Sequence, residues 1–404
     1  MKTLLINPDS PYLENAASYP PMGLLYVAAA LQKEGCKVSV LDFAAEPDIR
    51  PPALQHINTY DLVGITCVTP NYAGVQEIMQ HIPKGVPVML GGIHPTLFPD
   101  EVKAETGCQS VIVGEFETVA HELVLGAVQK SFYRGPIAKP EEILKPAREL
   151  VNLRNYAPGG WEGSTPVYTS RGCPFGCNFC AKLPSTKYRE IPLTQVLEEV
   201  DDCISLGFRN IVFGDDNIAA NPRRLRNLLA LLKTRDIRFR LNMDCRKPAE
   251  DIFKLAADAG CVEISFGVES GSPQILSLMN KMLSPRDSIE AIRLTQKYGM
   301  KAKAYFMVNY PGETERTVQE TLRFAKQAKP DKWLLSSFAP LPGSLVFKRP
   351  DMFGITNMST NWADYYLVGK GGVAKPCFET RYLTYKRQEE LHRMMYDGLK
   401  ERLG

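Results

Sequence analysis

Three closely spaced cysteines are the residues best suited to chemistry in this sequence of 404 residues. Cys173, Cys177 and Cys180 follow a C-x₃-C-x₂-C spacing, whereas the other cysteines are scattered singly. A structural zinc site normally has four nearby ligands, but the next cysteine is Cys203 and the next histidine is His392. An iron–sulfur cluster held by three thiolates would leave one iron open to another ligand. The spacing favours such a cluster, and a zinc ion completed by a distant residue is the alternative.

The cysteines follow the first strand of a β/α series that must position them. Strands are expected near 167–170, 210–213, 238–242, 263–267, 301–307 and 332–339, with helices at 194–206, 222–234, 248–259, 285–298 and 314–328. Six strands connected in this way predict an open, partial (β/α)₆ barrel, whose functional residues lie at the carboxyl ends of the strands.

An earlier series predicts a Rossmann-like domain. Apolar strands are expected at 2–7, 37–42, 62–68, 86–90 and 110–113, with helices at 21–34, 72–81 and 118–129, so the fold class is α/β with five parallel strands here. Ligands of such sheets bind outside the carboxyl ends of the strands. The candidate residues at those ends are Asp9, Ser10, Asp42, Thr66, Val68, Thr69, Gly91, Gly92, His94, Gly114 and Glu115. The alternative is that they are only turn residues, since Gly, Pro, Asn and Asp are common in turns.

These patterns divide the chain into four parts. The Rossmann-like domain is expected at 1–130, a proline- and glycine-rich linker at 131–165, the partial barrel at 166–345 and a C-terminal extension at 346–404. The extension ends in a helix near 385–403 and is expected to face the substrate.

Composition narrows the class of protein. The chain has 48 basic and 45 acidic residues, a net charge of +3, and no concentrated basic block, so no nucleic-acid partner is expected. No apolar run approaches the roughly 18 residues of a membrane span. A signal peptide is not expected either, and a cytoplasmic location is inferred.

The cysteine loop and the barrel pattern resemble the radical S-adenosylmethionine (SAM) superfamily, in which this spacing binds a four-iron four-sulfur (4Fe-4S) cluster. The segments Gly267–Gly271 and Phe306–Thr314 are similar to the family's G-V-E-S and F-x-x-G-x-P-G-E-T elements, with Asn309 where glycine is usual. The resemblance implies SAM-binding roles for Phe179, Asp215, Asp216, Asn217, Asn242, Arg246, Glu269, Ser270, Asn309 and Pro311.

The first domain is similar to the cobalamin-binding domain of class B radical SAM methylases. The resemblance implies that the strand-end residues named above line a cobalamin pocket. The D-x-H-x-x-G element that carries a cobalt-ligating histidine in other cobalamin domains is missing. His94 is therefore expected to line the pocket and not to bind the metal.

The implied activity is methylation of an unactivated carbon. Reductive cleavage of SAM gives a 5′-deoxyadenosyl radical that abstracts hydrogen from the substrate, and methylcobalamin delivers the methyl group. Expected partners are a small-molecule, peptide or protein substrate and a reductant such as ferredoxin or flavodoxin. No catalytic proton donor is identified.

Three alternatives remain open. A cobalamin-dependent radical enzyme could cyclise, rearrange or oxidise its substrate without methyl transfer. A non-catalytic sensor could bind the cluster or cobalamin only as a ligand, although it would not need the whole SAM site. A methylthiotransferase is disfavoured because Cys36, Cys67 and Cys108 are not clustered.

Overall fold

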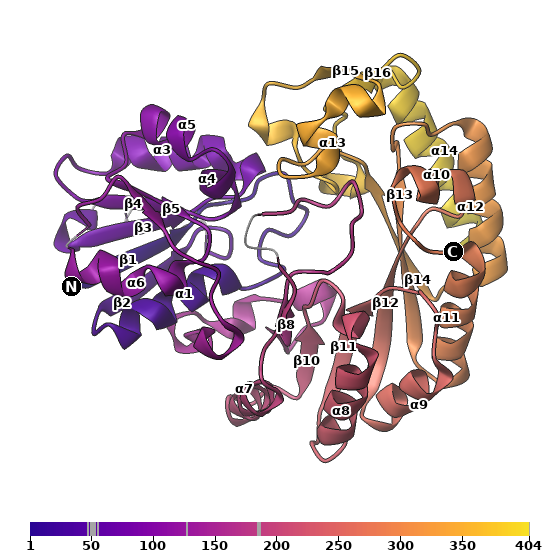
Figure 1. Cartoon of the computed structure of the whole chain (residues 1–404), viewed down its shortest axis with the longest axis horizontal. Coiled ribbons are helices and arrows are strands. Elements are labelled where there is room, and N and C mark those ends of the chain that lie inside the picture. Colours follow the sequence, from indigo (N-terminus) through magenta and orange to yellow (C-terminus); the bar gives the residue numbers. More distant parts are fainter. Residues whose placement is uncertain (47, 49–53, 55, 127, 184–186, 404) are drawn as a thin grey trace. The chain divides into compact units, whose positions relative to one another are not determined.

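The chain folds into two compact units. The computed structural model describes residues 1–403 except 47, 49–53, 55, 127 and 184–186 (Figure 1). The first unit comprises Met1–Gly163, Lys182–Ile191 and Asn361–Ala363. The second comprises Ser164–Ala181, Pro192–Thr360 and Asp364–Gly404. Each is described by itself below.

The first unit contains a six-stranded parallel sheet with the strand order β2-β1-β3-β4-β5-β6. Its strands are β1 (Lys2–Asn7), β2 (Lys37–Asp42), β3 (Leu62–Thr66), β4 (Val88–Gly91), β5 (Ser110–Val113) and β6 (Phe132–Arg134). Residues 3–6 of β1 are all buried because both faces of this sheet are covered. Leu5 packs into one core, while Leu4 and Ile6 pack into the other.

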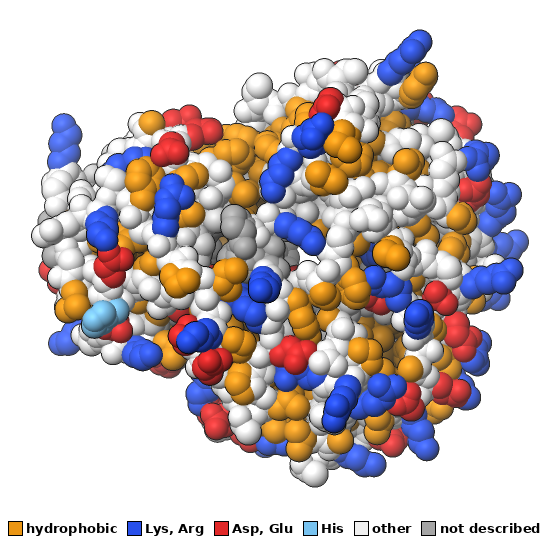
Figure 2. Space-filling view, viewed as in Figure 1, with side chains coloured by type: hydrophobic (Ala, Val, Ile, Leu, Met, Phe, Trp, Pro, Cys, Tyr) orange, Lys and Arg blue, Asp and Glu red, His pale blue; other side chains and the backbone are white. Residues whose placement is uncertain are grey.

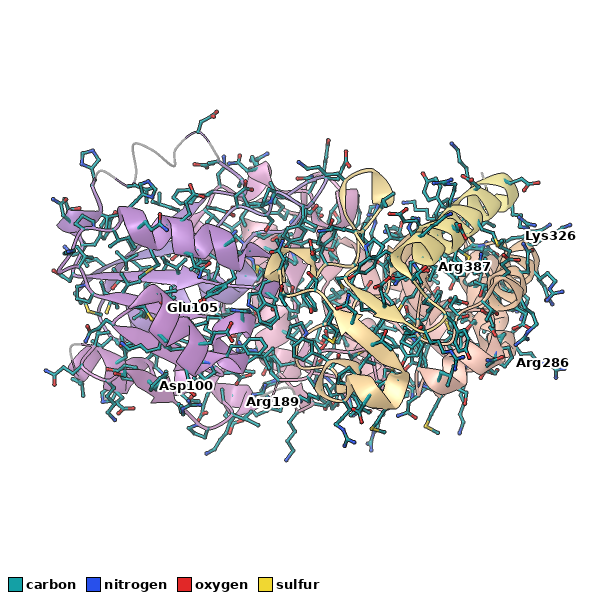
Figure 3. All side chains as sticks on the ribbon, turned by 90° about the horizontal axis from the view of Figure 1, so that it is seen from above. Asp100, Glu105, Arg189, Arg286, Lys326 and Arg387 are labelled. Atoms are coloured by element: carbon teal, nitrogen blue, oxygen red, sulfur yellow. The ribbon has the colours of Figure 1, made fainter. Side chains whose placement is uncertain are left out.

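Helices cover both faces of this sheet. They are α1 (Met22–Lys33), α3 (Tyr72–His81), α4 (Ile93–Leu97), α5 (Pro99–Thr106) and α6 (Ala120–Leu125). In Figure 1, α3, α4 and α5 lie over one face and α1 and α6 over the other. Glu105 of α5, labelled in Figure 3, accepts hydrogen bonds from Tyr72 (2.9 Å) and Gln76 (3.0 Å) and so joins α5 to α3.

The sheet has six strands and not the five that the sequence predicted, because β6 was missed. It pairs with β5 and buries Tyr133. Three residues are too few to show a hydrophobic period, so the sequence pattern missed it.

The described residues of 131–163, expected as a linker, belong to the first unit, where Tyr156 donates a hydrogen bond to Asp42 (2.7 Å). The expected helix 118–129 is α6, preceded by a 3₁₀ turn, and residue 127 lies outside the described residues.

The second unit contains an open six-stranded parallel sheet with the order β14-β13-β12-β11-β10-β7. These strands are β7 (Ser164–Val167), β10 (Asn210–Phe213), β11 (Arg238–Met243), β12 (Cys261–Glu269), β13 (Lys301–Val308) and β14 (Lys332–Ser337). Two short strands are additional: β8 (Ser170–Arg171) belongs to the second unit and β9 (Arg189–Glu190) to the first.

Helices follow the strands of this sheet along the chain. They are α7 (Leu193–Ser205), α8 (Pro222–Leu232), α9 (Glu250–Asp258), α10 (Pro273–Leu278), α11 (Pro285–Lys297) and α12 (Glu315–Ala328). Only the short α10 was not expected. Side chains alternate along β13: Phe306 packs on Phe324 of α12 (6.2 Å between ring centroids), and Tyr305 points to the opposite, inner face.

The C-terminal extension contains α13 (Leu345–Lys348), β15 (Ile355–Met358), β16 (Phe378–Thr380) and α14 (Tyr385–Leu403). Strands β15 and β16 are antiparallel. Arg387 of α14, labelled in Figure 3, donates to Glu315 of α12 (2.7 Å), which fixes α14 beside α12.

The surface shows no segregation of charge on the face drawn in Figure 2. Basic and acidic side chains are interspersed there, which agrees with the nearly balanced composition. Among the described helices, none is long and apolar enough to cross a membrane.

Candidate active site

The cysteine loop, residues 172–181, is anchored by Asp215 at the end of β10. Its carboxylate accepts hydrogen bonds from the Thr169 backbone N–H (3.1 Å), the Thr169 hydroxyl (2.8 Å) and the Ser170 hydroxyl (2.5 Å). Asp215 is only 1% exposed, and this burial raises the pKa of its carboxyl. Asp215 therefore holds the strand-to-loop turn in place and has little capacity left for a ligand.

The segment after α10 holds the other side of the loop. The backbone N–H of Asn178 donates to the Met279 carbonyl (2.9 Å), and its side chain donates to the Leu278 carbonyl (3.0 Å). Asn280 donates in return to the Gly176 carbonyl (2.8 Å). Side-chain and backbone bonds thus position the loop from both directions.

The three thiols of the loop line a cavity of about 510 Å³, here called the cysteine-loop cavity. None of the ten cysteines forms a disulfide; these three are at least partly exposed, whereas the other seven are buried. A hydrogen bond with Cys180 and the nearby Lys281 cation lower the pKa of Cys177 to about 7. Burial raises the pKa of Cys173, and the hydrogen bond with Cys177 raises the pKa of Cys180, so Cys177 alone of the three is shifted toward the thiolate form that iron ligation requires.

The separation of the thiols bears on the type of metal. Among the described residues, no three Cys, His, Asp or Glu side chains converge closely enough to hold a single metal ion. In an iron–sulfur cluster each thiolate binds a different iron, so the thiols need not converge on one point. The donor set suits a cluster better than a lone zinc ion.

Groups of both charge signs line the remaining wall of the cavity. Asp216 is exposed into it, and partial burial raises the pKa of its carboxyl. Glu269 pairs with Lys281 (2.7 Å), and these side chains are only 13% and 12% exposed. Arg246 pairs with Asp244 (2.6 Å) and stacks its guanidinium on the Phe175 ring. The wall could therefore recognise an ammonium and a carboxylate group together.

Seven of the ten expected SAM contacts line this cavity. They are Phe179, Asp215, Asp216, Asn217, Asn242, Arg246 and Glu269. Ser270, Asn309 and Pro311 are not among its lining residues, and the Ser270 hydroxyl is engaged with Thr321 (3.0 Å).

The sequence reasoning missed several residues of the cavity. Lys281 reaches it from beyond α10, and no local pattern marks this lysine. Asp244 lies just after the end of the expected strand 238–242, so this position could have marked Asp244 as a candidate site residue. Ser265 and Tyr305 also line the cavity because alternate side chains of β12 and β13 face inward.

Asn309 keeps the backbone conformation that glycine would adopt. Its φ is 70°, in the left-handed region that Asn tolerates better than most residues other than Gly. Its side chain donates to the Ser337 hydroxyl (3.3 Å). The departure from the family pattern therefore changes the side chain and leaves the turn intact.

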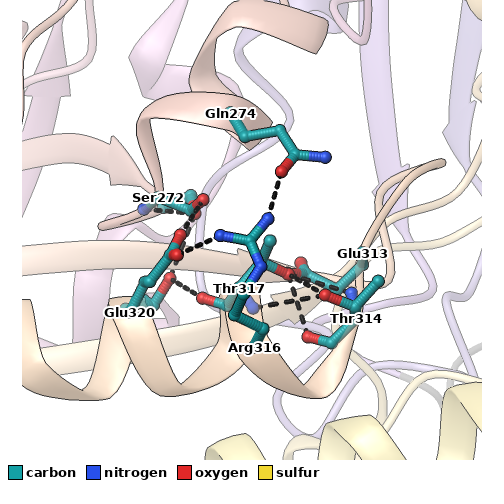
Figure 4. A network of polar contacts seen from close by, with 9 residues as sticks. Ser272, Gln274, Glu313, Thr314, Arg316, Thr317 and Glu320 are labelled. Carbon is teal, nitrogen blue, oxygen red and sulfur yellow. Dashed lines mark hydrogen bonds and ion pairs between the residues drawn. The ribbon is translucent and has the colours of Figure 1, made fainter.

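The Pro311–Thr314 segment leads into α12 through the network in Figure 4. Thr314 caps the helix through Thr317, whose hydroxyl donates to Glu313. Arg316 joins Glu320 of α12 to Gln274 of α10. These residues do not line the cysteine-loop cavity, so their contribution is to hold α10 and α12 together behind it.

At the strand ends of the first unit, two residues expected to contact cobalamin have carboxylates that are already hydrogen-bonded within the protein. Asp42 accepts from Asn7 (2.7 Å) and Tyr156 (2.7 Å). Glu115 binds Arg189, labelled in Figure 3, through both oxygens (2.5 and 2.8 Å). Both carboxylates fix loops at the strand ends.

The other strand-end residues leave a partly open rim. Asp9, Ser10, Thr66, Val68, Gly91, Gly92 and Gly114 are at least partly exposed, whereas Thr69 is buried. Gly92 has a φ of 109°, and a Cβ there would lie 2.6 Å from the Cys67 carbonyl oxygen. Only glycine suits this position, and it brings bare backbone to the rim, where a large ligand could approach.

His94 lies in an aromatic core beneath this rim. Its ring contacts Tyr72 (4.3 Å), Phe98 (5.1 Å) and Trp362 (5.3 Å). It is 0% exposed, and burial lowers its pKa to about 4. His94 is therefore neutral near pH 7 and closed to a ligand in this conformation. The sequence reasoning missed Trp362, which comes from the C-terminal extension.

Comparisons with known proteins agree with this arrangement. The radical SAM superfamily matches residues 167–325, and the B12 binding domain matches residues 14–124. Bacteriochlorophyllide d C-12(1)-methyltransferase of Chlorobaculum tepidum is 30% identical, covering 86% of this chain and 78% of its own. An uncharacterized methyltransferase of Pyrococcus horikoshii is 28% identical, covering 98% and 92%. Anaerobic magnesium-protoporphyrin IX monomethyl ester cyclase of Cereibacter sphaeroides is 26% identical, covering 86% and 63%.

A solved structure shares the fold of the whole chain. The radical SAM methyltransferase TsrM of Kitasatospora setae, with tryptophan and a SAM analogue bound, has a TM-score of 0.77 at 19% identity. The match covers 98% of this chain and 89% of that one.

Fold and site together define a radical SAM enzyme with a B12-binding domain. The chain belongs to the cobalamin-dependent radical SAM methyltransferase family. Its cofactors are a 4Fe-4S cluster, SAM and cobalamin, and the three available thiols fit the cluster.

Proposed function

We propose that this protein methylates an unactivated carbon of its substrate. The observation that carries the proposal is the cysteine-loop cavity, where three thiols adjoin a wall with both acidic and basic side chains. Such a wall suits the zwitterionic aminoacyl end of SAM next to an open iron. When bound, the cluster supplies an electron for cleavage of SAM, and methylcobalamin supplies the methyl group.

The chain's own residues have distinct positioning roles in this proposal. Asp216, whose carboxylate is exposed into the cavity, binds the ammonium group of SAM. Arg246 and Lys281 lie on the same wall and attract its carboxylate. Phe179, beside Cys180, covers the cluster side of the cavity and limits access of water. In the first unit, the exposed glycine rim receives cobalamin.

Cyclisation without methyl transfer is the second candidate. It is supported by the 26% identity to a magnesium-protoporphyrin monomethyl ester cyclase. Several relatives act on tetrapyrroles by name, so tetrapyrroles are the first substrates to test. Peptide, protein and other small-molecule substrates follow, with ferredoxin or flavodoxin as the electron donor.

The test uses anaerobically purified protein with reconstituted cluster, cobalamin, reductant and SAM carrying a deuterated methyl group. Mass spectrometry follows 5′-deoxyadenosine, S-adenosylhomocysteine and the substrate. Methylation predicts both cosubstrate products and transfer of the deuterated methyl group. A modified substrate without that label would instead support the cyclase-type reaction.

Two cysteine variants provide a matched control. Cys173→Ala removes a cluster thiol and is expected to abolish 5′-deoxyadenosine formation. Cys203→Ala alters a buried cysteine of α7 and should retain it. If SAM binds the reconstituted protein but is never cleaved with any substrate tested, the sensor alternative replaces the enzyme proposal.

A further inference from the structure

A series of polar contacts joins the ends of β10 and β11 to the first half of the cysteine loop. Its members are Asn217, Asp244, Arg246 and Phe175, and all four line the cysteine-loop cavity. Asn217 Nδ2 donates to Asp244 Oδ2 (2.7 Å), and the same oxygen accepts from Arg246 Nη2 (2.6 Å) and Nε (3.2 Å). The guanidinium lies 3.1 Å from the centroid of the Phe175 ring. Phe175 belongs to the loop segment that joins the first two thiols.

Asn217 is engaged in holding Asp244. Its Oδ1 accepts from the backbone N–H groups of Ala219 (3.1 Å) and Asp244 (3.3 Å), while its Nδ2 donates to the Asp244 carboxylate. Asn217 is only 4% exposed. The resemblance implied a SAM contact for Asn217, but these bonds leave it little capacity for a ligand and make it a support for Asp244.

The backbone also fixes the Asp244–Arg246 pair. Asp244 Oδ1 accepts from the backbone N–H of Arg246 (2.9 Å), and the two side chains are 17% and 24% exposed. The next residue, Lys247, has a φ of 44°. A non-glycine residue adopts this left-handed conformation at an energetic cost, and it persists where surrounding contacts hold the backbone. Both side-chain and backbone contacts therefore keep the guanidinium in one place.

Arg246 retains donors for a ligand. A guanidinium has five N–H donors, and only two of them, on Nε and Nη2, bond to Asp244. The Arg246 side chain makes no other hydrogen bond to the part of the chain that the structure describes, so three donors remain on a group that lines the cavity. A fixed, planar guanidinium with free donors suits a carboxylate. Without Asp244 the long Arg246 side chain would regain rotamer freedom and bind less well.

We propose that Asp244 is a positioning residue for SAM. It holds the Arg246 guanidinium against Phe175, so that the remaining N–H donors face the carboxylate of SAM. This role rests on the contact proposed above between Arg246 and SAM, and Asp244 acts through Arg246 without touching SAM itself. If Asp244 instead competed with SAM for Arg246, its removal would tighten SAM binding.

The test measures SAM affinity by calorimetry. The full-length protein carries reconstituted cluster and cobalamin but no substrate, so the outcome does not depend on methyl transfer. Asp244→Asn is expected to weaken SAM binding about tenfold, because Arg246 loses its charged partner. In an Arg246→Met background, which itself binds SAM weakly, Asp244→Asn should cause no further loss. Unchanged or tighter SAM binding by Asp244→Asn, or an equal loss in both backgrounds, overturns the proposal.

An aspartate outside the cavity provides the matched control. Asp251 accepts from Nε (2.5 Å) and Nη2 (3.0 Å) of Arg226, the same two guanidinium nitrogens, but neither residue lines the cysteine-loop cavity. Asp251→Asn should therefore leave SAM affinity unchanged, and a loss equal to that of Asp244→Asn would contradict a specific role for Asp244.

Arg246→Lys is the second variant should Asp244→Asn fold poorly. It keeps the positive charge but loses the planar group that binds Asp244 through two nitrogens and stacks on Phe175. SAM binding should weaken about fivefold, because a flexible ammonium is no longer held in place by Asp244. Wild-type affinity for SAM in Arg246→Lys overturns the proposal, since the charge alone would then suffice.

Discussion

Two neighbouring aspartates at the end of β10 have different tasks. Asp215 is buried under three donors from Thr169 and Ser170, whereas Asp216 is exposed into the cysteine-loop cavity. The resemblance to known enzymes assigned both to SAM, but the hydrogen bonds distinguish a residue that holds the loop from one that is available to a ligand.

The first prediction separates these two tasks. Asp216→Asn should weaken SAM binding about tenfold, because a charge-assisted contact becomes a neutral one, with little effect on stability. Asp215→Asn should cost about 2 to 3 kcal/mol of unfolding free energy, because an amide donor would then face hydroxyl donors. Calorimetric SAM titration and thermal unfolding measure the two effects. If Asp215→Asn weakened SAM binding as much as Asp216→Asn does and did not destabilise the protein, the two aspartates would not have the different roles assigned here.

The second prediction concerns the Glu269–Lys281 pair. Lys281→Met leaves the nearly buried Glu269 without its cation and should destabilise the protein by about 3 to 5 kcal/mol. Adding Glu269→Gln should recover part of that loss. Chemical denaturation of the two single variants and the double variant measures the coupling.

An exposed ion pair provides the control for this cycle. Arg293 and Glu290 on α11 are 55% and 44% exposed, so Arg293→Met should destabilise the protein far less than Lys281→Met does. The interpretation of Glu269–Lys281 as a buried pair fails if its coupling energy is as small as that of the α11 pair.

At the scale of elements, Glu313 links the stability of the α12 start to pH. It is buried at the helix entrance, accepts from Thr317, and has its pKa raised by burial from 4.5 to about 7. The protonated form favours the folded state, so its contribution is complete below pH 4.5. That contribution is lost as pH rises through about 7.

The third prediction follows from the direction in which the contribution of Glu313 to stability changes with pH. Between pH 4.5 and 8, Glu313 should remove roughly 3 kcal/mol from the unfolding free energy. Glu313→Gln has no ionisation here and should lose correspondingly less stability over the same interval. Urea unfolding followed by circular dichroism at several pH values tests this, and identical pH profiles would exclude Glu313 as the source.

The strand-to-helix turn of the first unit gives the fourth prediction. Gly92→Ala places a Cβ against the Cys67 carbonyl at a φ of 109°, which costs about 1 to 3 kcal/mol of strain. The shifted turn should also reduce cobalamin retained after reconstitution, measured by absorbance. Gly107→Ala, at another left-handed position but with no atom within 4 Å of its Cβ, is the control and should retain cobalamin.

At the scale of the whole molecule, the C-terminal extension contributes to the first unit. Asn361–Ala363 cluster with Met1–Gly163, and Trp362 packs on Phe98 (4.9 Å) and donates to Glu101 (3.3 Å). A residue more than two hundred positions away in sequence thus completes the aromatic core around His94.

The fifth prediction tests this long-range contribution. Trp362→Ala should open the core to water and raise the His94 pKa from about 4 toward 6.5, as measured by NMR titration of histidine-labelled protein. Trp333→Ala removes an indole from the second unit and should leave His94 unchanged. A His94 pKa that stays near 4 in Trp362→Ala would show that the other neighbours suffice to bury it.

Local patterns were enough to predict most of the elements and to single out three cysteines of one loop as candidate cluster ligands. The strands Lys2–Asn7 and Asn210–Phe213 and the helix Tyr385–Leu403 have the predicted bounds, because continuous apolar runs and helical periods depend on neighbours in the chain. The three cysteines were equally recognisable, since a single loop supplies all of them.

Other features depend on contacts between distant segments. Strand β6 is too short to show a period, and Lys281 reaches the cysteine-loop cavity from beyond α10. Asp215 and Asp216 look alike until Thr169 and Ser170 are placed beside only one of them. The contact of Trp362 with His94 likewise forms only where folding joins residues far apart in the chain. Sequence spacing records what neighbouring residues can do together, whereas burial and hydrogen-bond partners exist only after distant segments have packed.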